Sequence, residues 1–196
     1  MRYDTEHKQR THEKVVQEAA NAIRQHGPDK IGIASLMSKL GLTHGGFYAH
    51  FNSKDDLVAE AISHMFEDRM EAFRKCLAGA EPAEGLASYI DLYLSIRHRD
   101  RRDKGCPVAS LASDIARMPL VARKRFEVGI QHLTDAFTDV LKILDKPQPE
   151  ILAASVVAEM VGAMTIARAI TNSDLSERIL ATARRNVKER VGLANT

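Results

Sequence analysis

Cys106 is the residue of this sequence whose type and setting point most directly to chemistry. It lies in the segment "DKGCPVASLASDIA", between Gly105 and Pro107. Because proline is favoured at the first position of a helix, Cys106 is predicted to be an N-cap. A positive helix terminus and nearby cations both favour the nucleophilic thiolate. Four cations precede it in the chain: Arg99, Arg101, Arg102 and Lys104.

Two interpretations of Cys106 follow from this setting. In the first, it is a sensing thiol that is alkylated or oxidised. In the second, it is a small buried cysteine that begins a helix. The other cysteine, Cys76 in "FRKCLAG", falls in the middle of an expected helix and is interpreted as structural or incidental.

Metal and enzyme chemistry have weaker support. Di-metal helical bundles need Glu-x-x-His pairs from two helices, and the nearest case here is Glu60 with His64, spaced by four and not repeated. No Cys/His cluster has zinc spacing, and the sequence contains neither a phosphate-binding loop nor Gly-x-Ser-x-Gly. We therefore expect no enzyme activity, no cofactor and no metal, with a helical-bundle metalloprotein as the alternative.

The composition is that of a soluble, mostly helical protein. The chain has 196 residues, no Trp and two Cys, and its length can bury a core without disulfides. Its N-terminus is polar and unlike a signal peptide. The longest apolar run, 152–170, is interrupted by Ser155, Glu159 and Arg168 and is not expected to span a membrane. A cytoplasmic location and no membrane partner are the simplest expectations.

The positive charge is concentrated at the N-terminal end. Residues 1–54 hold eight Lys/Arg and five Asp/Glu, a net of +3, with five of the eight histidines. Residues 55–196 hold twenty Lys/Arg and twenty-one Asp/Glu, a net charge of −1. This distribution favours a polyanion-binding end on a nearly neutral body.

The apolar residues recur at three- and four-residue spacing between Gly, Pro and Asn signals, which predicts an all-α fold. The last two long helices are the least polar and are expected to pack together across a two-fold axis. Helices are predicted over about 6–25, 33–40, 44–51, 54–77, 83–97, 107–116, 119–144, 148–171 and 174–191, with a loop over 98–105.

The segment "GLTHGGFYAHFNSKDDL" has the form of a turn between two short helices. Gly41 suits a left-handed turn and Thr43 an N-cap, a pattern typical of a helix-turn-helix. Phe47 is expected to pack against the preceding helix. Ser53, with Asp56 three residues later, predicts the N-cap of a long helix. The exposed face of the second short helix is expected to consist of Thr43, His44, Gly45, Gly46, Tyr48, Ala49 and His50.

That face has the chemistry for contact with double-stranded DNA. Its small residues permit close approach to base edges, and His44 offers a ring nitrogen to a base or phosphate. Tyr48 can donate to a phosphate. Lys54 adds its charge to the amide groups at a helix N-terminus, a natural phosphate site.

The run "IASLMSKLGLTHGGFYAHFNSKDDLVAEAI" resembles the DNA-binding domain of the tetracycline-repressor-like (TetR) family. The length and helical remainder also suit this family, although only residues 10–60 carry specific motifs. The residues that carry the resemblance are Leu36, Leu40, Gly41, Phe47, Tyr48, His50, Phe51, Ser53, Lys54 and Leu57.

The resemblance implies a DNA-binding domain over 1–53 and a helical effector-binding and dimerisation domain over 54–196. It also implies a homodimer, double-stranded operator DNA as partner, an unidentified small-molecule effector and, most simply, repression. The implied DNA contacts are Thr43, His44, Gly45, Gly46, Tyr48, His50 and Lys54. Family members that answer electrophiles or oxidants have a Gly-Cys pair similar to Gly105-Cys106.

Two departures from the family pattern affect the DNA interface. Gly32 stands where Ser or Thr often contacts a phosphate, and the Gly45-Gly46 pair offers only backbone to the bases. Direct readout is therefore expected from Thr43 and His44.

The central helices are expected to hold the effector, although each candidate residue also suits ordinary core packing. A helical DNA-binding protein without an effector is the remaining alternative. The candidate lining, besides Cys106, is Tyr89, Tyr93, Met118, Phe126, Phe137, Met160 and Met164.

Overall fold

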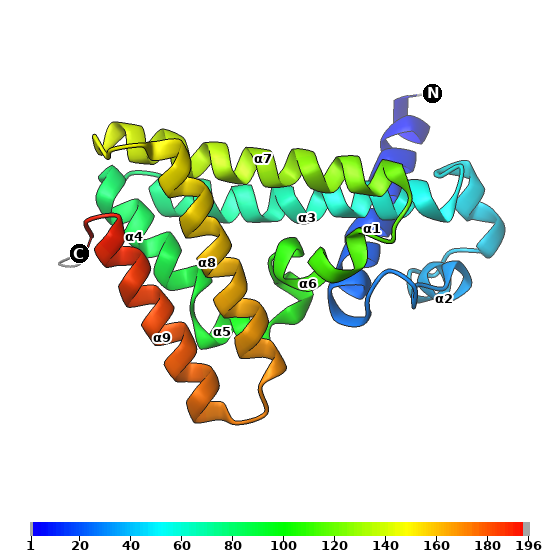
Figure 1. The fold of residues 1–196 in the computed structure, drawn as a ribbon. Coiled ribbons are helices and arrows are strands. Elements are labelled where there is room, and N and C mark those ends of the chain that lie inside the picture. The colour runs from blue at the N-terminus through cyan, green and yellow to red at the C-terminus, as the bar shows by residue number, and fades with distance from the viewer. Residues whose placement is uncertain (1, 194–196) are drawn as a thin grey trace.

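The computed structural model describes residues 2–193, with side chains from Glu6 onward, and this part of the chain is helical without a strand (Figure 1). This confirms the all-α prediction. The elements are α1 (Arg2–His26), α2 (Ile33–Lys39), the 3-10 helix η1 (His44–Ala49), α3 (Lys54–Leu77), α4 (Pro82–Tyr93), α5 (Ile96–Asp100), the 3-10 helix η2 (Arg102–Lys104), α6 (Pro107–Ile115), α7 (Leu120–Ile143), α8 (Pro149–Ala169) and α9 (Ser173–Arg190).

Two long helices, α3 and α7, lie side by side and form the spine of the molecule (Figure 1). Gly129 permits their close approach, because a Cβ at this position would lie 2.2 Å from the ring of Phe66. The elements α1, α2 and η1 gather at one end of the spine, and α4, α8 and α9 at the other. The helix α3 packs on α1 and also on α4 and α7, so it connects the two ends.

The predicted ends of α1 and α2 are confirmed to within one residue, although α1 begins at Arg2 and not at about residue 6. The residues that end these helices act locally. Gly27 follows α1 with φ +83° and Gly41 follows α2 with φ +70°, both in the left-handed region that glycine adopts without strain. The Ser53 hydroxyl accepts a hydrogen bond from the Asp56 amide at 3.0 Å and so begins α3.

The single helix predicted over 83–97, and the loop over 98–105, are wrong. The helix α4 ends at Tyr93, and the short helices α5 and η2 lie where the loop was expected. Ser95 causes the new start, because its hydroxyl accepts from the His98 amide at 3.1 Å and donates to the Leu92 carbonyl at 2.8 Å. The periodicity of the apolar residues continues across this break and therefore concealed it.

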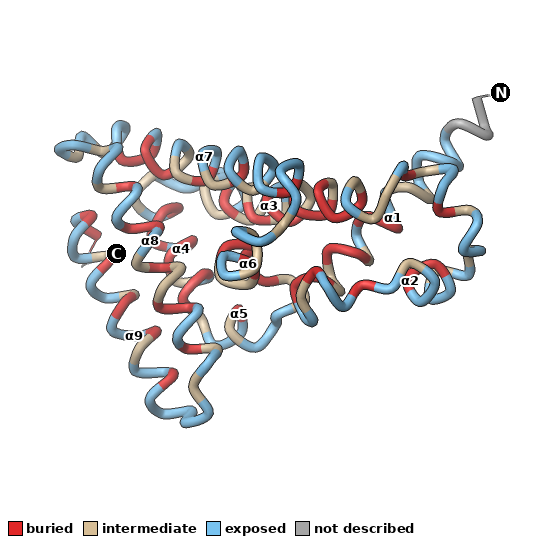
Figure 2. Tube along the Cα trace, turned by 45° about the vertical axis from the view of Figure 1, so that its right-hand side comes forward, coloured by how far each residue is buried: buried red, intermediate tan, exposed pale blue. Residues whose placement is uncertain are grey.

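The buried apolar residues form one core along α3 and α7 and between α4, α8 and α9 (Figure 2). In the described chain, α8 is the one helix long and apolar enough to cross a membrane, with a mean hydropathy of 1.6 over its best window. It packs between α7 and α9, as a core helix does, yet only 39% of that window is buried. A substantial apolar part of α8 therefore faces outward.

Candidate nucleic-acid interface and interior site

A 3-10 helix follows the glycine turn, where an α-helix over 44–51 was predicted. Its i→i+3 bonds run from the Gly46 amide to the Thr43 carbonyl (3.0 Å) and from the His50 amide to the Phe47 carbonyl (2.9 Å). Two adjacent glycines are poor helix formers, and six residues are too few to compensate. The predicted N-cap is confirmed, since the Thr43 hydroxyl accepts from the Gly46 amide at 3.2 Å.

Four residues of this segment form an open, slim surface, here termed the reading face: Thr43, His44, Gly45 and Tyr48. Tyr48 is 62% exposed, and its ring meets that of His44 edge-on at 6.0 Å. A Cβ at Gly45 would meet nothing within 4 Å. The reading face therefore presents hydroxyl and imidazole groups beside a stretch of bare backbone.

Gly46 and His50, also expected on the exposed face, turn partly inward. A Cβ at Gly46 would approach the Met37 side chain of α2 to 3.9 Å, so this glycine serves the packing of η1 on α2. His50 is half-buried and its Nδ1 has no hydrogen-bond partner among the described residues. Burial, and then the neighbouring His12, lower the pKa of His50.

An aromatic brace holds η1 between α1 and α3. The His12 ring stacks on Phe51 at 4.5 Å, and its Nε2 lies 2.7 Å from a Glu60 carboxylate oxygen. Phe51 in turn stacks on the fully buried Phe47 at 5.3 Å. The brace fixes the reading face relative to the two helices behind it.

Lys54 stands beside this face at the start of α3. Its Nζ donates to the Asp29 carbonyl at 3.4 Å, which holds the half-buried side chain near the turn before α2. Asp55 and Asp56 occupy the same first turn and oppose an approaching anion. Lys54 is therefore the group here that would attract a phosphate.

The structure brings together only part of the predicted effector set. Tyr89, Tyr93, Phe137 and Met160 line a narrow apolar recess between α4, α7 and α8, with a free volume of only about 10 Å³. Its remaining walls are supplied by Leu133, Val157 and Val161.

Three of the predicted lining residues lie outside this recess. Phe126 packs edge-on against Phe66 at 5.5 Å, and Met164 is fully buried in the core on α8. Met118 borders a different hollow, beside Lys54 and Pro28. The sequence could not separate these positions, since all seven share the apolar character of core residues.

Cys106 is the N-cap of α6, as predicted, and it is fully buried. The four loop cations expected around it are engaged elsewhere: Arg99 with Asp100 and Ser176, Arg101 with Asp103, Arg102 with the Arg168 carbonyl, and Lys104 with Asn21. The arginines whose charges reach the thiol are instead Arg24 and Arg168, from distant parts of the chain.

His98 is a central residue that the sequence did not reveal. Its Nδ1 donates to the Tyr93 carbonyl at 2.6 Å, and its Nε2 accepts from the Cys106 amide at 3.1 Å. The ring is therefore neutral. Burial, followed by the charge of Arg69, lowers the pKa of His98 to about 3. The imidazole thus joins the end of α4 to the start of α6.

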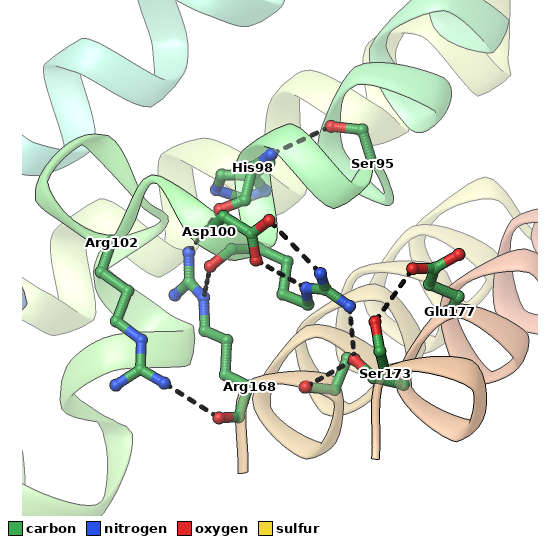
Figure 3. Close-up of polar contacts among 10 residues, drawn as sticks. Ser95, His98, Asp100, Arg102, Arg168, Ser173 and Glu177 are labelled. Atoms are coloured by element: carbon green, nitrogen blue, oxygen red, sulfur yellow. Dashed lines mark hydrogen bonds and ion pairs between the residues drawn. The ribbon is translucent and has the colours of Figure 1, made fainter. Parts of the chain in front are cut away.

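Arg168 of α8 holds the same segment from the other side (Figure 3). Its guanidinium donates to the His98 carbonyl at 2.9 Å, the Arg99 carbonyl at 3.2 Å and the Ser110 hydroxyl at 3.3 Å. Arg102 returns a hydrogen bond to the Arg168 carbonyl at 2.9 Å. One feature of the sequence indicated this role for Arg168, namely its position inside an otherwise apolar stretch.

Arg24 connects this interior to the end of the molecule that carries the reading face. Its fully buried guanidinium donates to Asp68 at 2.7 Å and to the Met65 and Asp103 carbonyls, both at 3.3 Å. A helix of the N-terminal end is therefore tied to both α3 and η2. Among the described residues, no three His, Cys, Asp or Glu side chains converge as metal ligands would.

A helix-turn-helix end joined to a larger helical body defines this as a protein of the DNA-binding regulator class. Residues 15–61 match the family model described as bacterial regulatory proteins, tetR family. A curated relative is the uncharacterized HTH-type transcriptional regulator YvdT of Bacillus subtilis (strain 168), 30% identical over 70 residues. That match covers 36% of each protein, so the chain spans about a third of the length of this relative.

Solved structures match over nearly the whole chain. A TetR transcriptional regulator from Chloroflexus aurantiacus J-10-FL is 25% identical with a TM-score of 0.76, covering 96% of this chain and 98% of that one. A TetR-family regulator from Agrobacterium tumefaciens shares the fold, with 23% identity and a TM-score of 0.77 over 91% of this chain and 98% of that one. The reduced form of E. coli NemR also shares it, with 17% identity and a TM-score of 0.80 over 91% of this chain and 95% of that one. Residues 15–61 therefore belong to the tetR family of bacterial regulatory proteins, and the chain shares the fold of these solved regulators.

The neutral His98 makes stability depend on pH. In the unfolded chain His98 binds a proton below about pH 6.5, whereas in the folded protein it does so only below about 3. The unfolded state therefore gains protons first, and stability falls as pH falls from about 6.5 towards 3, by up to about 1.4 kcal/mol per pH unit. We expect urea unfolding to show this loss, and His98→Gln to remove it.

The His98→Gln variant also distinguishes the stability that comes from the hydrogen bonds of His98 from the stability that depends on its protonation. At pH 7.5, His98→Gln should cost about 2 to 4 kcal/mol, because the Tyr93 carbonyl and Cys106 amide lose their partner. The exposed His132→Gln serves as control and should change neither quantity. An equal stability difference between wild type and His98→Gln at pH 5 and pH 7.5 would contradict the assignment.

Proposed function

We propose that the protein is a homodimeric transcriptional repressor that binds a pseudo-palindromic DNA operator and is released by a small-molecule effector. The observation that carries the proposal is the reading face, held outward by the aromatic brace within the segment that matches the family model. In this proposal Thr43 and His44 contact base edges, and Tyr48 and Lys54 bind the flanking phosphates.

The bare backbone of the reading face shapes the expected recognition. Gly45 allows the 3-10 helix to approach the major groove closely and contributes no side chain. Gly32 caps α2 without a side-chain hydrogen bond, so it offers no hydroxyl to a phosphate. Base preference should therefore depend on few side chains, chiefly Thr43 and His44.

The outer side of α8 and α9 supports the homodimer. Ile166 is 52% exposed and lies in an open groove between these helices, together with Ile179 and Thr182. A Cβ at Gly162, on the same groove, would meet nothing within 4 Å. An apolar groove of this kind on a long helix pair suits burial against the same surface of a second copy.

The interior provides a route by which an effector would alter DNA binding. The segment 95–106 is held by Arg168 from α8, which lies beside the groove, and by Arg24 from α1. A displacement of α4 or α6 around a ligand would strain both sets of hydrogen bonds. The separation of the two reading faces in a dimer would then change relative to successive major grooves, about 34 Å apart.

Cys106 supports a second kind of release, by thiol-reactive compounds. Its thiolate would add across the double bond of N-ethylmaleimide, forming an S–C bond while the adjacent carbon takes a proton. The product needs volume in a fully buried site beside His98 and Tyr93. Overpacking there would separate α4 from α6.

For DNA binding, we expect Lys54→Ala to weaken affinity for all sequences and to reduce the slope of log K against log salt by roughly one. One phosphate contact would be lost, without loss of sequence information. Fluorescence anisotropy with duplexes selected by the protein from a random pool provides the measurement. His44→Ala should change the selected sequence instead.

Lys142→Ala is the matched control, because this lysine lies on α7 far from the reading face, paired with Glu150. It should leave affinity and salt slope unchanged. If Lys54→Ala behaves like Lys142→Ala, the docking arrangement is wrong.

For assembly, we expect Ile166→Glu to convert the dimer to monomer, since a carboxylate would be buried in the groove. Sedimentation velocity measures the change, and DNA affinity should fall with it. Leu120→Glu places the same charge on a 62% exposed leucine at the start of α7, away from the groove, and should remain dimeric. An Ile166→Glu protein that stays dimeric would place the interface elsewhere.

For thiol release, N-ethylmaleimide should abolish DNA binding by the wild type and by Cys76→Ser, and spare Cys106→Ser. The reaction should be slow, because the Cys106 thiol is fully buried and must wait for an opening of the site. Equal release of the Cys106→Ser protein would remove Cys106 as the sensing group.

A further inference from the structure

Three buried polar side chains of the interior form no hydrogen bond with the described residues. Arg69 of α3 is 9% exposed, and Tyr89 and Tyr93 of α4 are 1% and 2% exposed. The Nε of Arg69 and both phenol oxygens lack a hydrogen-bond partner among the described residues, and Arg69 forms no ion pair with them. The Tyr93 phenol lies beside the Cys106 thiol, but the pair does not meet hydrogen-bond geometry. An unpaired cation buried in this way is costly.

The packing of α3 on α4 brings these groups together. The two helices are joined by residues 78–81 and pack on each other, with Phe73 and Tyr89 in edge-on contact at 4.8 Å. Arg69 lies one turn before Phe73, and Tyr93 one turn after Tyr89. The charge of Arg69 acts on both phenols, so the guanidinium lies close to them. The two tyrosine rings are 6.2 Å apart, so the guanidinium and both phenols border one small volume.

The permanent charges that act around this volume are positive. Arg69 acts on both Tyr93 and His98, and Arg168 and Arg24 also act on His98. The acidic groups that act on Tyr93 are the Cys106 thiol and the Tyr89 phenol, and among the described residues no carboxylate does so. Burial is the main cause that raises the pKa of Tyr89 and Tyr93, so both phenols remain protonated donors at neutral pH. The volume therefore offers donors and positive charge but no carboxylate.

We propose that this volume binds the carboxylate of a small organic acid, through Arg69, Tyr89 and Tyr93. This deepens the proposed function and rests on it, since the acid would be the effector. A carboxylate accepts several hydrogen bonds and pairs well with a guanidinium, so it would satisfy all three donors. The ring faces of the same tyrosines form part of the apolar recess between α4, α7 and α8, and the side chains around this recess would have to move apart to admit the hydrocarbon body.

Matched acids and amides test the proposal on the full-length protein. Benzoate, phenylacetate and octanoate would each be titrated by calorimetry beside the corresponding primary amide. We expect at least one acid to bind about tenfold or more tightly than its amide, because the amide lacks the charge and adds a donor to a site of donors. The same acid should raise the unfolding temperature.

Variants assign the preference to its residues. Arg69→Gln should bind acid and amide with equal affinity, and Arg69→Lys should keep part of the preference for the acid. Tyr93→Phe should weaken binding of the acid several-fold. Arg185→Gln, on an exposed arginine of α9, should behave as wild type. Without ligand, Arg69→Gln should be at least as stable as wild type, since it removes an unpaired buried charge.

Several results would overturn the proposal: no acid binding at millimolar concentration, no preference over the amides, or a preference that survives Arg69→Gln. A strong loss of ligand-free stability in Arg69→Gln would also do so, because Arg69 would then be part of the core. DNA binding is measured separately by anisotropy. Acid binding without DNA binding would reject the proposed function alone, and DNA binding without acid binding would reject this site alone.

Discussion

The imidazole of His98 is the contact on which the middle of the molecule depends. It spans the Tyr93 carbonyl and the Cys106 amide, and it can do so only as a neutral ring with its proton on Nδ1. Burial and the charge of Arg69 enforce that state by lowering the pKa of His98 to about 3. Without this ring, the break after α4 and the start of α6 would leave two buried backbone groups unpaired, at a cost of about 1 to 3 kcal/mol each.

Arginines extend this arrangement in two directions. Arg168 connects the carbonyls of segment 95–106 to α8, beside the open groove, and Arg24 connects η2 to α1 behind the reading face. Each donates to main-chain oxygens of this stretch, which contains only the short helices α5 and η2. The stretch lies between the helices behind the reading face and those that form the open groove. Arg69 differs from these two arginines because its side chain has no hydrogen-bond or ion-pair partner among the described residues.

Local signals explain why the N-terminal end could be predicted in such detail. Gly27, Gly41, Thr43 and Ser53 act on residues three or four positions away, and such short-range rules leave little freedom. The type of η1 was missed because two glycines weaken the α-helix without showing in the apolar pattern. Gly45 faces open space and Gly46 packs against Met37, and this difference could be seen only in the tertiary structure. The break at Ser95 was missed for a related reason, since apolar periodicity runs across it unchanged.

The sequence by itself determined the helical class, the turn-and-helix segment, the caps and the residues of the reading face, because each depends on neighbours along the chain. Only the tertiary structure decided which charges lie in the interior. The cations next to Cys106 in sequence have partners elsewhere, and those that reach it come from α1 and α8. The reason is physical: a hydrogen bond or a charge in a low-dielectric core acts through space, and residues separated by some seventy positions, such as Arg168 and His98, become neighbours only when the helices pack.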